Sequence, residues 1–255
     1  MNAAACVLVT VSRTSGSVPR EVGAWMTVTP DGITGTVGGG HLEFDAIARA
    51  RTALAGGELE NEVRYPLGPT LGQCCGGVVW LRFERIAAGE DLAAHLPGET
   101  LRPVALFGAG HVGLAIARIA RDLPLALHWV DSRADQFPAE PPARGWRLEA
   151  LDPPADAVPD LASGSVVLIM SHSHAEDFDI VAACLKRQRQ QQDLAFIGLI
   201  GSRTKWASFR QRLATRGFTE DDLAQVVCPI GVPGVAGKQP AVIAVAALAQ
   251  ILTLP

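Results

Sequence analysis

Two segments of the chain carry residue types suited to holding a ligand. The first, Gly108-Ala109-Gly110-His111-Val112-Gly113, follows an apolar stretch and has the glycine spacing of a turn whose backbone amides hold a phosphate. Asp131 ends the next apolar stretch, about 20 residues on, where a carboxylate would bind the ribose of an NAD-like ligand. The order predicts a phosphate or nucleotide site made by Gly108, Gly110 and Gly113. The alternative is a scaffold of the same type with an empty crevice, and the role of His111 stays open.

The second segment, Gln73-Cys74-Cys75-Gly76-Gly77, offers thiols on a flexible backbone. Adjacent cysteines without a second pair do not supply the four ligands of a structural zinc site. The two glycines free the backbone beside Cys75, so its thiolate could meet a soft centre such as molybdenum, copper or a persulfide. Cysteines are also among the most commonly buried residues, which is the alternative reading.

Two later turns add polar side chains after apolar strands. His172 and His174 follow one strand, with Asp177 next along the chain. Two histidines and one carboxylate do not close a metal site, so we predict ligand contact, with a helix N-cap as the alternative. Ser202 and Arg203 follow another strand, and we predict an N-cap and a phosphate contact, the alternative being a solvated first turn.

A third glycine segment, Gly38-Gly39-Gly40, leads into a helix that begins near His41. Exposed amides at such a helix start could bind an anion. Glu43 in the first turn would equally suit the helix dipole on its own.

The elements that must position these residues fall into two sets. Short β-branched stretches at 6–13, 24–29, 33–37, 59–65 and 78–86, with a helix at 42–54, predict a small α+β domain over 1–88. A linker or short capping helix is predicted over 89–102. From 103 to 255 strands alternate with helices, which predicts a Rossmann-like parallel sheet. Its strands are predicted at 104–107, 126–130, 165–170 and 194–200, and its helices at 112–121, 177–189, 202–213 and 240–252.

Composition narrows the class of protein. The 255 residues are 48% apolar and 19% charged, with a net charge of −4, so we expect a folded chain and no nucleic-acid binding. No stretch is long and apolar enough for a membrane span, and the first ten residues lack the cationic start of an export signal. We therefore expect a cytoplasmic protein whose five cysteines are reduced, with Cys6, Cys184 and Cys228 in the core.

Read together, the motifs resemble the XdhC family of xanthine dehydrogenase accessory proteins, also described as XdhC/CoxI-like. The resemblance spans nearly the whole chain, and it is carried by these segments in order: Gly16-Ser17-Val18-Pro19-Arg20, Gly35-Thr36-Val37-Gly38-Gly39-Gly40-His41-Leu42-Glu43, Gln73-Cys74-Cys75-Gly76-Gly77, Phe107-Gly108-Ala109-Gly110-His111-Val112-Gly113, Ser171-His172-Ser173-His174, Gly198-Leu199-Ile200-Gly201-Ser202-Arg203, Pro229-Ile230-Gly231 and Lys238-Gln239-Pro240.

The resemblance implies a chaperone that binds the molybdenum cofactor, a phosphorylated molybdopterin. The carrier would protect the cofactor while a cysteine desulfurase exchanges an oxo ligand for sulfur, and would then deliver it to the molybdenum-binding subunit of xanthine dehydrogenase. Cys75 would contact the metal, with Cys74 and Gln73 beside it. The resemblance implies no enzymatic activity of the chain's own, and homo-oligomerisation stays open.

Two other functions fit parts of the sequence. An NAD(P)-dependent oxidoreductase would use Asp131 for the ribose and His172 or His174 as a proton shuttle. A redox or metal sensor would use Cys74 and Cys75 without any cofactor.

Overall fold

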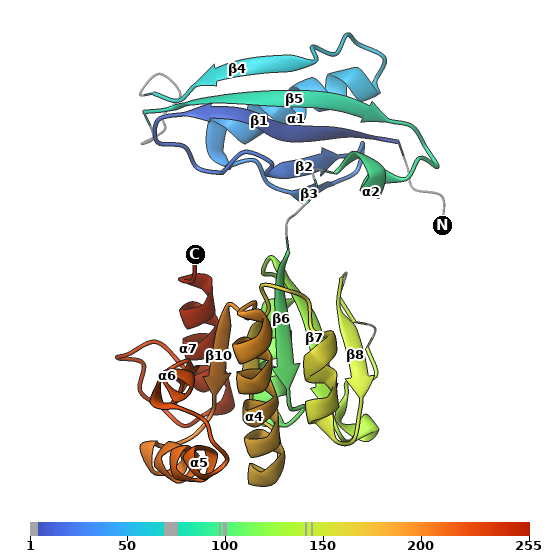
Figure 1. Cartoon of the computed structure of the whole chain (residues 1–255). Helices are drawn as coiled ribbons and strands as arrows, with labels where there is room; N and C mark the ends of the chain where they lie inside the picture. The colour runs from blue at the N-terminus through green and yellow to red at the C-terminus, as the bar shows by residue number, and fades with distance from the viewer. Residues whose placement is uncertain (1–4, 69–75, 97, 99–100, 141, 144) are drawn as a thin grey trace. The chain divides into compact units, whose positions relative to one another are not determined.

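The computed structural model describes residues 5–68, 76–96, 98, 101–140, 142–143 and 145–255. Contacts within the chain divide it into two compact units, Met1–Glu99 and Thr100–Pro255 (Figure 1). The point of division falls inside the segment 89–102, which contains the short helix α2 (Leu92–His95) as part of the first unit.

The first unit is an antiparallel sheet with the order β3-β2-β1-β5-β4 and one long helix. Alternate residues Val7, Val9 and Val11 of the central strand face the helix, which buries Leu42 and three alanines at helical spacing against them. The elements are β1 (Cys6–Ser15), β2 (Trp25–Val28), β3 (Ile33–Gly35), α1 (Gly40–Leu54), β4 (Glu62–Pro66) and β5 (Val78–Ile86).

The second unit is a six-stranded sheet, parallel throughout, with the order β11-β10-β9-β6-β7-β8. The first strand of the unit, β6, lies in the middle, and the chain winds outward from it in both directions. The strands are β6 (Arg102–Phe107), β7 (Leu125–Asp131), β8 (Arg147–Ala150), β9 (Val166–Ile169), β10 (Phe196–Leu199) and β11 (Val226–Val227). The helices are α3 (His111–Ala120), η2 (Ala134–Gln136), η3 (Pro154–Asp160), α4 (His174–Gln191), α5 (Arg203–Thr215), α6 (Glu220–Leu223) and α7 (Pro240–Leu252).

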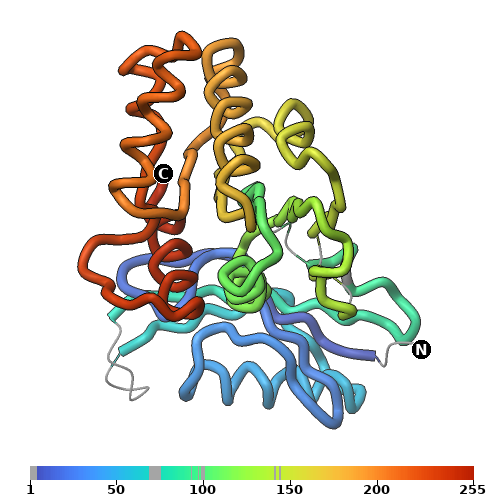
Figure 2. The backbone as a smooth tube through the Cα atoms, turned by 90° about the horizontal axis from the view of Figure 1, so that it is seen from below, coloured from blue at the N-terminus to red at the C-terminus, as the bar shows by residue number. Residues whose placement is uncertain are grey.

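Both faces of this sheet are covered. Ala105 and Phe107 of β6 point to the face packed by α4 and α5, and Val104 and Leu106 point to the face packed by α3 and α7. In Figure 2 the gold helix α4 and the green helix α3 can be followed on opposite sides of the strands. Strands buried on both faces explain the near-continuous apolar runs of this half of the sequence.

One buried cation ties α4 to the chain segment before β9. Arg187 is only 6% exposed, and its guanidinium donates to the carbonyls of Val158, Pro159 and Leu161 at 2.7–3.2 Å. It also makes a two-pronged contact with the Asp193 carboxylate at 2.9 and 2.6 Å. This one side chain therefore holds η3 and the end of α4 together.

The α/β class predicted from the sequence is confirmed, with a parallel sheet in the second unit and an antiparallel sheet in the first. The predicted start of α4 at residue 177 is wrong, since Ser173 caps the helix and His174 begins it. The short elements α6 and β11 were not predicted. Cys6 and Cys184 are buried as expected, whereas Cys228 is only partly buried.

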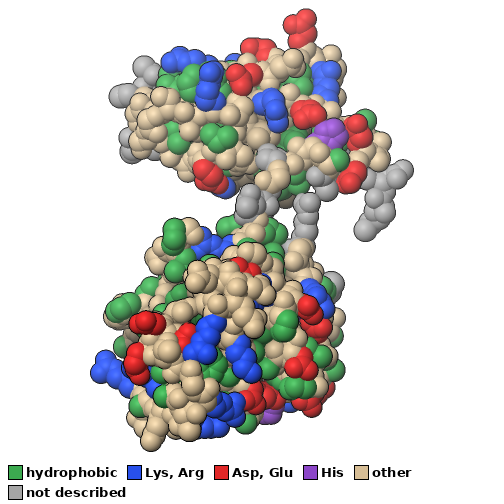
Figure 3. Space-filling model, in the orientation of Figure 1, with side chains coloured by type: hydrophobic (Ala, Val, Ile, Leu, Met, Phe, Trp, Pro, Cys, Tyr) green, Lys and Arg blue, Asp and Glu red, His purple; other side chains and the backbone are tan. Residues whose placement is uncertain are grey.

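The visible surface of each unit mixes charges of both signs. Figure 3 shows lysine and arginine side chains interspersed with aspartate and glutamate, with no broad basic area among the described residues on the face shown. In the part of the chain that the structure describes, no helix combines the length and the apolar character needed to cross a bilayer.

Candidate functional site

The predicted phosphate turn connects β6 to α3 and is closely packed at two of its three glycines. A Cβ on Gly108 would lie 2.2 Å from the carbonyl oxygen of Met170, and a Cβ on Gly113 would lie 2.0 Å from that of Gly108. Both glycines are therefore required by the packing of the turn itself. A Cβ on Gly110 would meet no atom within 4 Å, so the approach to the backbone there is open to a ligand.

The helix after the turn begins without a side-chain cap. Gly110 is the N-cap of α3 and has no side chain to offer, so the first amides of the helix lack an internal acceptor of that kind. Amides at a helix start, together with the helix dipole, favour a phosphate or carboxylate.

Asp131 locks the turn from the neighbouring strand. Its side chain is 1% exposed and accepts from the amide of Ala109 at 2.6 Å, from the amide of Arg133 at 2.9 Å and from the Arg133 guanidinium at 2.9 and 3.1 Å. Burial works against the charged form, but these bonds outweigh it and hold the pKa of Asp131 below its usual value. A ribose could use this carboxylate only by displacing bonds it already makes, so the geometry favours a positioning role.

Trp129, two residues before Asp131 on β7, also holds this turn. Its indole Nε1 donates to the carbonyl of Gly108 at 3.0 Å, and the ring is 1% exposed. The ring also meets the edge of Phe137 with centroids 5.4 Å apart. The turn is thus fixed on one side by a carboxylate and on the other by an indole.

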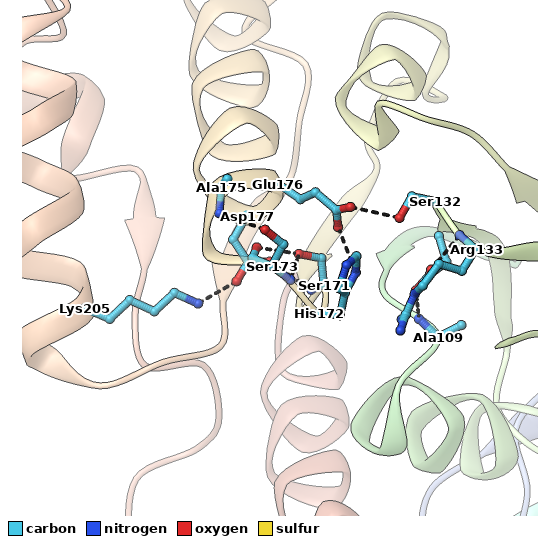
Figure 4. A network of polar contacts seen from close by, with 11 residues as sticks. Ala109, Ser132, Arg133, Ser171, His172, Ser173, Ala175, Glu176, Asp177 and Lys205 are labelled. Carbon is cyan, nitrogen blue, oxygen red and sulfur yellow. Dashed lines mark hydrogen bonds and ion pairs between the residues drawn. The ribbon is translucent and has the colours of Figure 1, made fainter.

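The loop after β9 carries an imidazole with a carboxylate partner (Figure 4). His172 Nδ1 lies 3.3 Å from Glu176, and the other oxygen of Glu176 accepts from the Ser132 hydroxyl at 2.8 Å. Ser132 follows β7, so this chain of contacts links the loops on both sides of β6. His172 is 43% exposed, which leaves its ring accessible. His174, by contrast, is the first residue of α4 and is not part of this network.

A buried ion pair anchors that loop to the next strand. Asp177 accepts from the amide of Ser171 at 2.8 Å and from Lys205 Nζ at 2.5 Å, and Lys205 also donates to the carbonyl of Ile200 at 2.9 Å. The side chains of Asp177 and Lys205 are 1% and 10% exposed. The ammonium of Lys205 is therefore engaged within the framework by Asp177 and the Ile200 carbonyl. Ser202 caps α5 as predicted, by accepting from the amide of Lys205 at 3.1 Å.

These loops meet at the point where the winding of the sheet reverses. The turn after β6 lies between the loops after β7 and β9, the usual place for a ligand in an open parallel sheet. Arg133 and His172 flank it with a guanidinium and an imidazole. We call the loops after β6, β7 and β9 together the switch-point crevice, after the usual place of ligands in open parallel sheets, and their chemistry suits a phosphate or an organic anion.

No metal site is formed by the described residues. No group of three or more His, Cys, Asp or Glu side chains among them is arranged to hold a metal ion. Gln73, Cys74 and Cys75, which were predicted to bind the cofactor with Cys75 at the metal, lie outside the described residues, so their roles stay predictions.

In the first unit, the segment 16–20 contacts two other motifs. The amide of Gly77 donates to the carbonyl of Ser17 at 3.0 Å, and the amide of Leu67 donates to the carbonyl of Gly77 at 2.8 Å. Arg20, at the end of the segment 16–20, donates from Nη1 to the carbonyl of Thr36 at 3.3 Å. The segment 16–20 therefore lies beside both Gly77 and the segment 35–43.

An anion was predicted at the amides of the Gly38-Gly39-Gly40 segment, and a carboxylate of the chain itself already lies there. The Glu43 carboxylate accepts from the hydroxyl of Thr36 at 2.5 Å and from the amides of Val37 and Gly39 at 3.1 and 3.2 Å. Burial opposes ionisation of this group, but the hydrogen bonds prevail and lower the pKa of Glu43. An external anion at these amides would have to compete with Glu43.

The pKa of Glu43 is lower in the folded chain than in the unfolded chain. At pH values above the unfolded-state pKa, its ionised carboxylate therefore stabilises the first unit, and this stabilisation is lost as the pH falls through the folded-state pKa. We expect Glu43→Gln to destabilise the chain by about 1–3 kcal/mol near neutral pH, and the difference from wild type to shrink on acidification toward about pH 3. Urea unfolding at several pH values, with hydrogen exchange of the first unit, measures this. Exposed Glu58→Gln is the control, and a difference that stays constant with pH would contradict the role.

Sequence reasoning did not identify three residues of the crevice: Ser132, Arg133 and Glu176. Glu176 stands at i+4 from His172, a spacing that pairs side chains on a helix, and this was the available signal. Arg133 carried no periodic signal, because its role depends on a side-chain direction fixed by Asp131.

Comparisons with known proteins cover both units. Residues 104–251 match the XdhC Rossmann domain family, and residues 2–66 match the XdhC and CoxI family. The Gln73–Gly77 segment lies between the two matched stretches.

Two similar proteins add to these matches. The uncharacterized protein YqeB of Escherichia coli strain K12 is 29% identical over 249 residues, which cover 93% of this chain and 41% of the relative. The chain thus spans about two fifths of the length of that curated relative. A crystal structure from Bacillus halodurans, described as a xanthine dehydrogenase, has a TM-score of 0.74 at 21% identity, covering 98% of this chain and 91% of that one. At 21% identity, this similarity shows only that the two chains share a fold.

Proposed function

Since the chain belongs to the XdhC family, we propose that it is an accessory carrier of the molybdenum cofactor for xanthine dehydrogenase. In this role it holds the cofactor while a cysteine desulfurase supplies sulfur to the metal, and then releases it to the enzyme. The carrier acts in the cytoplasm and turns over no substrate of its own. The observation that carries the proposal is the family match over parts of both units.

The geometry supports this proposal by the fit of an anionic cargo. The open backbone at Gly110 and the uncapped start of α3 would receive a phosphate. Soft thiolate ligands suit molybdenum, which gives Cys75 its proposed role at the metal. Cys75 lies two residues before Gly77, whose amide donates to the carbonyl of Ser17 in the first unit.

Molybdenum and pterin analysis of the freshly purified full chain tests the proposal. We expect both in comparable amounts, and we expect Cys75→Ser to lose them under fully reducing conditions. Cys228→Ser is the matched control, because Cys228 is a partly buried thiol of the second unit. A redox sensor based on Cys74 and Cys75 predicts no cofactor in any of these proteins.

The role itself is tested on the partner enzyme. We expect xanthine dehydrogenase produced without this protein to contain cofactor that lacks the sulfur ligand and to regain activity when the loaded carrier is added. Xanthine dehydrogenase that is already fully sulfurated and active without the carrier would rule the role out.

An NAD(P)-dependent oxidoreductase is the second candidate, favoured by the imidazole of His172 with its Glu176 partner in the crevice. It predicts nicotinamide binding and turnover that depends on His172. The carboxylate of Asp131 argues against the oxidoreductase. It already accepts hydrogen bonds from Ala109 and Arg133, and a ribose hydroxyl would have to replace them. Binding measurements with NAD and NADP separate the two functions.

A further inference from the structure

A pocket of about 490 Å³ lies at the same edge of the parallel sheet as the switch-point crevice, beyond β9. It is bounded by the turn after β10, by the glycine-rich loop 229–237 after β11, and by the first turns of α7. We call it the β10–α7 pocket. Its volume is in the range of small-molecule sites, and the carboxyl ends of parallel strands are where such sites occur.

The walls and the rim of this pocket differ in chemistry. The walls are aliphatic, and they include Ile200, Ile230, Val232, Val242 and Ile243. Arg203 is the one charged residue among the described residues that line it, and it is exposed. Lys205, two residues on, is held by Asp177, whereas no carboxylate among the described residues pairs with Arg203.

The loop that forms one wall is anchored on both sides. The amide of Ile230 donates to the carbonyl of Leu199 at 3.2 Å, and the amide of Val232 donates to that of Ala246 at 3.1 Å. The amide of Gly231 donates to the side chain of Gln250 at 2.7 Å. A preformed pocket binds with little ordering cost, because its walls need not be assembled around the ligand.

We infer that the β10–α7 pocket is a second binding site, which takes a small phosphorylated heterocycle. The flat ring lies against the aliphatic walls, and the phosphate meets the Arg203 guanidinium and the first amides of α5. A nucleotide and a phosphorylated pterin share this chemistry. The inference does not depend on the carrier role, since the pocket would bind such a ligand in a chain that carries no molybdenum.

Calorimetric titration of the full chain tests this site with two probes, AMP and neopterin monophosphate. We expect at least one to bind, and Arg203→Gln to weaken that binding about tenfold or more, the effect of losing a charge-assisted hydrogen bond. Val235→Asp, which adds a negative charge at the exposed rim, should weaken it as well. Arg118→Gln is the matched control, because Arg118 is an exposed arginine of α3 outside the pocket.

Hydrogen exchange locates the bound probe. We expect the bound probe to protect the amides of residues 200–206 and 229–243. Tighter binding of AMP or of neopterin monophosphate then identifies whether the ligand is a nucleotide or a phosphorylated pterin. Three results would overturn the inference: no binding of either probe at millimolar concentration, unchanged affinity in Arg203→Gln, or protection confined to the turn after β6. Molybdenum content is measured separately, so failure of the carrier role is distinguishable from failure of this site.

Discussion

Gly113→Ala is expected to destabilise the second unit by about 3 kcal/mol, the upper end of the cost of overpacking. In an ordinary helix the same change gains up to about 1 kcal/mol, because alanine is the better helix former. Here the new Cβ would lie 2.0 Å from the carbonyl oxygen of Gly108, and a backbone atom cannot move aside as a side chain can. The clash therefore outweighs the helix propensity. Urea unfolding, with hydrogen exchange of residues 100–255, measures the effect.

Gly110→Ala is the matched control three residues earlier. Its Cβ would meet no atom within 4 Å, and its φ of −76° suits alanine. We expect a loss of no more than about 1 kcal/mol, the cost of alanine at an N-cap, together with weaker binding of inorganic phosphate. Equal destabilisation by the two variants would show that the turn has no open position for a ligand.

Arg187→Met is expected to destabilise the second unit by about 3–5 kcal/mol, which is typical of removing one partner of a buried pair. The variant keeps most of the aliphatic volume but removes the guanidinium that donates to Asp193 and to the carbonyls of Val158 and Leu161. The pKa of Asp193, which its bond to Arg187 now lowers, should rise in the variant.

Lys186→Met provides the control for this prediction, because Lys186 is the preceding residue of α4 and is exposed. A change within about 0.5 kcal/mol is expected there. If Arg187→Met and Lys186→Met unfolded at the same urea concentration, the stabilising role of Arg187 would be contradicted. Arg187→Lys should fall between them, since an ammonium reaches fewer of the acceptors than the planar guanidinium does.

The fold was predictable because its signals are periodic. The apolar runs of β6, β7 and β9, each followed by a glycine or polar turn, indicated a parallel sheet, and the structure confirms it. Elements with little periodicity were missed. The two-residue strand β11 and the four-residue helix α6 are too short for a hydrophobic pattern, and they exist because neighbouring elements supply their partners.

The candidate site was predictable only in its backbone. The turn at Gly108 to Gly113 follows from spacing, because glycine is required wherever backbones approach closely. The partners of Asp131 and Glu43 did not follow, since each carboxylate could equally face solvent, a ligand or a neighbouring amide. Only the three-dimensional arrangement shows that both are used within the chain.

The indole of Trp129 gives the protein an optical probe of the turn between β6 and α3. Because its N–H is bonded to the carbonyl of Gly108, any shift of that carbonyl alters the electrostatic environment of the excited ring. The difference in emission between wild type and Trp129→Phe would therefore report occupancy of the crevice in real time, without a label and without knowledge of the ligand.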